Sequence, residues 1–226
     1  MPDKPVPINP VYDIWEFLTG TSNDHMLLGN WRFLFVALFS ALVIASIYLA
    51  VRNWREDPGQ RSAAHVSFFV ARFLIGCMWF QGMLWKLPLP VSGALRYWTE
   101  KQMGTRAAFE IHREIILNFL VPNLKFFGPL VFLAELTFAT SLILGLGVRF
   151  AGALGTLFVL HLWLGIYRPD DPAEWPWLYV FLALLMFLFA MHGAGRSLGL
   201  DAWLRRSVPA VRDGTGFWGK LLRIAG

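Results

Sequence analysis

Ionisable side chains lie within long apolar stretches of the sequence, among them Arg72, Lys86, Glu135 and His161. A charge near the centre of a bilayer costs at least about 2.5 kcal/mol, so such residues usually face a partner or a cavity. An amine or guanidinium can donate a hydrogen bond to a carbonyl oxygen, and a carboxyl group or an imidazole can supply a proton to it. These residue types therefore predict a polar site inside a membrane, built around Glu135, Lys86 and His161.

The spacing of these residues predicts where they lie in depth. Arg72 and Lys86 are fourteen positions apart, which on a helix places them within about 40° of one face and about 21 Å from each other. Counted from the cytoplasmic face, Arg72 falls at about 9 Å, Glu135 and His161 at roughly 17–20 Å, and Lys86 at roughly 30 Å. We expect Glu135 to pair with Lys86 if their helices are adjacent, with His161 at a matching height.

Each of these residues also has a plain structural interpretation. Arg72 can extend to the cytoplasmic headgroups or form a structural ion pair, and Lys86 can anchor a helix end at the interface. Glu135 is too short to reach the surface, but a structural salt bridge or a protonated, hydrogen-bonded acid would account for it. His161 can serve as a packing residue. The sequence leaves these alternatives open.

The elements that carry these residues are membrane-spanning helices. The chain has 226 residues, 56% of them hydrophobic and only 15% charged, which is typical of an integral membrane protein. Apolar segments long enough to cross a bilayer predict an all-α helical bundle with five spans. They lie at 32–52, 66–88, 128–148, 150–168 and 175–194.

The distribution of Lys and Arg predicts the orientation. Basic residues in the 52–65 connection and in the tail 205–226 favour the cytoplasm for both segments. The N-terminal segment 1–31, the 89–127 loop and the acidic loop RPDDPAEW at 168–175 are then outside, in the periplasm if the membrane is a bacterial inner membrane. We expect an amphipathic helix in the 89–127 loop to lie on the membrane surface, and a second one at about 200–206.

Several cofactors and partners are not expected. With Cys77 as its single cysteine, the chain cannot form an internal disulfide or a Cys-ligated metal or iron–sulfur site by itself. His161 and His192 differ in predicted depth by more than about 10 Å, which argues against a haem between them. No GxGxxG follows a strand, so neither a flavin nor a nucleotide is expected. The basic residues flank apolar runs, as residues that set membrane topology do, so nucleic-acid binding is not expected either.

Three sequence stretches carry a family resemblance. The run R-F-L-I-G-C-M-W-F-Q-G-M-L-W-K-L, which begins at Arg72, resembles the first-helix signature of the DoxX family. Glu135 followed by S-L-I-L-G-L-G-V-R-F resembles the glutamate helix of that family, and H-G-A-G-R-S-L-G-L-D resembles its closing segment. The resemblance covers 66–204, a four-helix membrane domain, and is nearest to the DoxD branch. The span at 32–52 is additional to that core and is expected to dock another subunit.

The resemblance implies a membrane subunit of a quinone-linked oxidoreductase such as thiosulfate:quinone oxidoreductase, which is not expected to be active alone. In this interpretation Glu135, Lys86 and His161 are the reacting groups, and Arg72, Trp85 and Trp79 form the quinone pocket. Its partners are the other subunits of a membrane complex, the lipid bilayer and quinone. The alternative is a non-catalytic structural or assembly subunit of a larger respiratory or photosynthetic complex. A transporter is less favoured, because no inverted repeat is evident.

Overall fold

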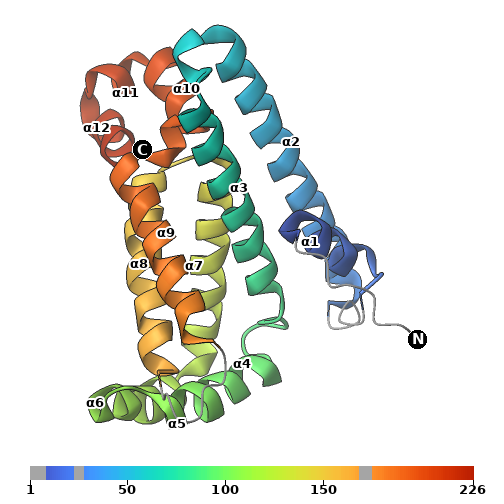
Figure 1. Ribbon diagram of the computed structural model, residues 1–226. Helices are drawn as coiled ribbons and strands as arrows, with labels where there is room; N and C mark the ends of the chain where they lie inside the picture. Colours follow the sequence, from blue (N-terminus) through green and yellow to red (C-terminus); the bar gives the residue numbers. More distant parts are fainter. Residues whose placement is uncertain (1–8, 23–27, 168–174) are drawn as a thin grey trace.

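The computed structural model describes residues 9–22, 28–167 and 175–226, and every element in these ranges is a helix (Figure 1). Four helical segments are long and apolar enough to cross a membrane: Gly29–Glu56, Ala63–Leu84, Leu124–Leu144 and Val148–Gly165. The chain is therefore a multi-pass membrane protein with an all-α fold. The acidic loop at 168–175, expected outside the membrane, lies outside the described residues except for Trp175.

Each of the five predicted apolar segments contains one helix. They are α2 (Arg32–Glu56), α3 (Ala63–Leu84), α7 (Leu124–Leu144), α8 (Val148–Gly165) and the shorter α9 (Pro176–His192). The boundaries differ from the predicted ones by up to four residues because local capping sets them. The Ser62 side chain accepts from the His65 N–H and starts α3. Gly145, at φ 71°, ends α7, and Gly147, at φ 62°, precedes α8.

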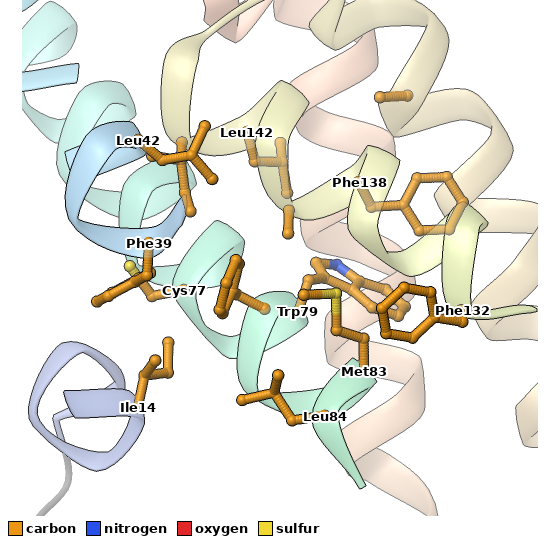
Figure 2. Packing of buried hydrophobic residues seen from close by; sticks show 14 of the residues in the cluster. Ile14, Phe39, Leu42, Cys77, Trp79, Met83, Leu84, Phe132, Phe138 and Leu142 are labelled. Carbon is orange, nitrogen blue, oxygen red and sulfur yellow. The ribbon is translucent and has the colours of Figure 1, made fainter. Parts of the chain in front are cut away.

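Small residues allow close helix packing in the bundle, where α3 packs along α7 and α8 along α9. A Cβ atom on Gly76 would lie 2.9 Å from the backbone nitrogen of Ile143, and one on Gly152 would lie 2.7 Å from the carbonyl oxygen of Met186. Side chains such as Phe132 and Phe138 fill the core between α3 and α7 (Figure 2). These two glycines therefore allow the helices to pack closely.

The N-terminal part of the chain packs against the bundle. Helix α2 leans away from α3, and α1 (Pro10–Thr19) lies between them (Figure 1). Ile14 of α1 is fully buried and lies close to Phe39 and Leu84 (Figure 2). Part of the predicted external segment 1–31 is thus a helix that packs against the membrane bundle.

The two ends of the bundle carry different short helices. At one end lie α4 (Gly93–Tyr97), η4 (Trp98–Met103), α5 (Gly104–Arg106), α6 (Glu110–Glu114) and η5 (Ile115–Leu120). At the other lie α10 (Leu200–Ser207), α11 (Pro209–Asp213) and α12 (Gly216–Ala225) (Figure 1). The predicted helices in the 89–127 loop and near 200–206 are confirmed as helices. Ile111 and Phe119 are 74% and 55% exposed, as expected of a helix that lies on a membrane.

Candidate functional site

A cavity of about 610 Å³ lies among the helices of the bundle, near the end that α4 and η4 cover. Its lining is mainly apolar and aromatic, which suits a ring-containing apolar ligand. Five of the six residues predicted for the site contribute to this lining: Trp79, Trp85, Lys86, Glu135 and His161. The structure thus brings together groups from α3, α7 and α8 that are far apart in the sequence.

Lys86 and Glu135 form a buried ion pair. Nζ of Lys86 lies 2.7 Å from Oε2 of Glu135, and the two residues are only 5% and 3% exposed. Nζ also donates to the carbonyl oxygen of Gly82 at 2.7 Å and lies 4.0 Å from the ring centroid of Trp85. The pairing that the depth estimate predicts is confirmed.

Three groups lie around the Lys86 ammonium group: the Glu135 carboxylate, the Gly82 carbonyl oxygen and the Trp85 ring. The ammonium charge neutralises the carboxylate and holds it in place. A direct role of Lys86 toward a ligand stays a prediction.

Glu135 keeps one oxygen for the cavity. Oε2 is enclosed and lies against Nζ of Lys86, while no hydrogen bond joins Oε1 to another described residue. Since Glu135 lines the cavity, Oε1 can accept a hydrogen bond from a ligand hydroxyl or exchange a proton with it. Of the two paired side chains, the Glu135 carboxylate is the one suited to exchange a proton with a ligand.

Two tryptophans form aromatic walls of the cavity. Trp79 packs edge to face on Phe138 and Phe158, with ring centroids 5.2 and 5.9 Å away, and Figure 2 shows its ring reaching from α3 toward α7. Trp85 meets Trp98 at 6.3 Å. The Nε1 of Trp79 is enclosed and has no hydrogen-bond partner in the part of the chain that the structure describes. Both rings offer flat apolar surface to a ligand ring.

His161 lines the cavity and meets a second histidine that the sequence analysis missed. Its Nδ1 lies 2.9 Å from Nε2 of His112, which belongs to α6. The sequence did not predict this contact because His112 lies in a surface helix, 49 residues from His161. The available indication was that both residues lie toward the same end of the bundle. In the described residues no third metal-ligating side chain joins this pair.

Arg72 does not line this cavity. It is fully buried and donates hydrogen bonds to the carbonyl oxygens of Leu142, Ile143 (3.0 Å) and Ser197 (3.3 Å). The end of α7 leaves carbonyls without helical partners, and the guanidinium satisfies them. The structure places Arg72 in a structural junction rather than with the other predicted pocket residues.

Other buried polar side chains complete this junction. Asn53 of α2 donates to the carbonyl oxygen of Gly199 at 2.9 Å. Asp201 accepts from the backbone N–H groups of Gly147 at 2.9 Å and Val148 at 3.3 Å. Burial raises the pKa of the Asp201 carboxyl group above its usual range, although these two N–H groups act in the opposite direction. The junction joins α2, α3, the α7–α8 turn, the segment before α10 and the first turn of α10.

Cys77 is fully buried in the apolar core near Phe39 (Figure 2). It is not among the residues that line the cavity.

Searches of protein-family models, curated proteins and solved structures find no match to this chain.

Proposed function

We propose that this chain is the membrane subunit of a quinone-linked oxidoreductase and that the cavity binds the quinone ring. The observation that carries the proposal is the buried carboxylate of Glu135, which pairs with Lys86 through one oxygen and lines an aromatic cavity of a membrane bundle. Such a site meets the needs of a quinone, which requires apolar walls for its ring and a proton-exchanging group near its oxygen.

The chemistry assigns a role to each side of the site. Reduction of a quinone takes two electrons and two protons and gives a quinol. Glu135 delivers one of the two protons to a carbonyl oxygen of the quinone, Lys86 holds the carboxylate, and His161, which also lines the cavity, hydrogen-bonds the ligand. The second proton comes from solvent. The electrons come from outside the chain. In the resemblance to DoxD, two thiosulfate ions lose them to form tetrathionate, with a partner subunit taking part.

The resemblance to the DoxX family gains support from the junction. Arg72, Gly145 and Asp201 belong to the three separate stretches that carry the resemblance. They meet at one end of the bundle: the Asp201 N–H donates to the Gly145 carbonyl oxygen at 2.8 Å, and a Cβ atom built on Gly145 would lie 2.7 Å from Cζ of Arg72. A shared structural role for these stretches is what a common fold over 66–204 would require.

The proposed topology has five spans, with α9 as the fifth, in a bacterial inner membrane. Arg52, Arg55 and Arg61 lie at the same end of the bundle as α10 to α12, so one basic end faces the cytoplasm under the positive-inside rule. The N-terminus and the α4–η5 segment are then periplasmic. Fusing a reporter enzyme that is active only in the periplasm after residue 107 tests this orientation.

Ligand binding tests the site directly. Decylubiquinone titrated into the purified protein should quench the fluorescence of the cavity tryptophans. Glu135→Gln and His161→Phe should weaken the binding, whereas Trp218→Phe, at a 70% exposed position on α12, should leave it unchanged. Saturable binding that both cavity variants leave unchanged would refute the site.

The assembled complex tests the activity. With all native partners present, thiosulfate should reduce a soluble quinone. If no such reduction occurs and the purified chain binds no quinone, the chain is a structural subunit. The buried ion pair of Lys86 with Glu135 and the exposed apolar side chains of α2 favour that second interpretation. Activity that survives both Glu135→Gln and Lys86→Ala would contradict the assigned residues.

A further inference from the structure

The contact between His112 and His161 extends the site beyond the cavity wall. Nε2 of His112 and Nδ1 of His161 are 2.9 Å apart, and the two rings are inclined at 66°. His161 lines the cavity, while His112 is not among the lining residues. His112 can therefore influence a ligand only through the histidine it contacts.

The hydrogen bond restricts where the protons are. An N–H···N bond needs one nitrogen that carries a proton and one that does not. If Nδ1 of His161 accepts, the neutral ring carries its proton on Nε2. If Nδ1 of His161 donates instead, its Nε2 is an acceptor, and neutral His112 carries its proton on Nδ1. The two arrangements offer opposite groups to the cavity.

The charge in the cavity favours the first arrangement, since the enclosed Nδ1 of His112 has no partner among the described residues and stays unsatisfied in both arrangements. Glu135 contributes a carboxylate to the same cavity, and an N–H of His161 suits that charge better than a lone pair does. No hydrogen bond joins Nε2 of His161 to another described residue, and His161 lines the cavity.

We infer that His112 is a positioning residue that keeps the proton of His161 on Nε2, so that the cavity offers an N–H donor to a carbonyl oxygen of an oxidised quinone. The quinone part of this inference rests on the proposed function, whereas the arrangement of protons does not. The site is then asymmetric, with an acceptor at Glu135 and a donor at His161. One carbonyl of a bound quinone should be hydrogen-bonded more strongly than the other.

Nitrogen NMR of the full-length protein labelled with ¹⁵N-histidine tests the proton arrangement without any ligand. We expect His161 to show a protonated Nε2 and an unprotonated, hydrogen-bonded Nδ1. His112→Phe keeps a ring of similar size but removes the hydrogen bond, and it should give a mixture of the two tautomers of His161. Ile111→Ala, at a 74% exposed position on α6, is the matched control and should leave His161 unchanged. A proton on Nδ1 of His161 in the unaltered protein would overturn the inference.

Infrared spectra of decylubiquinone labelled with ¹³C at either carbonyl test the ligand contact. In the unaltered protein the stretching band of one carbonyl should shift to lower frequency on binding, and the shift should disappear in His161→Phe. His112→Phe should reduce the shift and weaken binding by about 2- to 12-fold, the value of one net hydrogen bond. If His112→Phe binds quinone but keeps the full shift, His112 has no positioning role. If the unaltered protein binds no quinone, the proposed function and the carbonyl contact fail together, and the NMR result separately decides the proton arrangement.

Discussion

Gly82 provides the sharpest test of the cavity, because it differs from the other glycines of the bundle. A Cβ atom built on Gly82 would meet no atom within 4 Å, and Gly82 lines the cavity. On the same helix, six residues earlier, a Cβ atom on Gly76 would lie 2.9 Å from the backbone nitrogen of Ile143. The same substitution should therefore have opposite effects at the two positions.

The magnitudes follow from this geometry. Gly82→Ala should stabilise the protein by about 0.5–1 kcal/mol, because alanine is the better helix former and nothing has to move. Gly76→Ala forces the backbones apart and should cost about 1–3 kcal/mol, less the same helix preference. For a chain of this size 1 kcal/mol shifts the melting temperature by about 2–4 °C, so the two variants should melt on opposite sides of the unaltered protein.

A larger side chain at position 82 separates the effect on protein stability from the effect on ligand binding. Gly82→Leu places an apolar group in the space that a ligand ring would occupy, so it should weaken decylubiquinone binding more than tenfold while the protein stays at least as stable. Melting curves in detergent and fluorescence titrations on the same samples give both values. Undiminished binding by a stable Gly82→Leu protein would refute the cavity as the quinone site, and a destabilised Gly82→Ala protein would refute the open space at this position.

Two further predictions concern the buried charges. Lys86→Ala leaves the Glu135 carboxylate unpaired and should cost about 3–5 kcal/mol, whereas Lys86→Met combined with Glu135→Leu should cost far less, because it removes both charges. A double-mutant cycle of the melting temperatures of the Lys86 and Glu135 variants measures this coupling. If the two single substitutions change stability additively, the two side chains do not stabilise each other. Burial raises the pKa of Asp201 above its ordinary value of 3.8, so the folded protein binds more protons than the unfolded one between the two values. The stability that this group contributes should then be complete below about pH 4 and be lost as the pH rises through the raised pKa. Asp201→Asn should remove this pH dependence of the melting temperature, measured between about pH 3.5 and 6.5. An unchanged pH dependence would argue against a raised pKa.

The sequence predicted the features that depend on a single helix or on the large free-energy cost of burying a charge. Long apolar runs defined the helices, because little else than a membrane helix accommodates them. The pairing of Glu135 with Lys86 followed from depth alone, since a carboxylate that deep needs a partner. Both inferences need only the rise per residue and the cost of a buried charge.

The features that the sequence did not reveal depend on backbone groups and on contacts between elements. The partners of Arg72 are carbonyl oxygens, which every residue has and no sequence pattern marks. The contact of His112 with His161 depends on how α6 lies across the end of the bundle. Gly82 and Gly76 look alike in the sequence, and only the neighbouring helices show that one borders a space and the other a backbone.

The location of α1 has a consequence for biosynthesis. Helix α1 precedes its packing partners in the chain, yet its buried face, which includes Ile14 and Leu18, rests on both α2 and α3. The surface that receives α1 exists only after both later helices have been translated and inserted side by side. Docking of α1 is therefore a late step of assembly. Until then its apolar face is open, and a chaperone or a neighbouring membrane protein has a limited time in which to bind it.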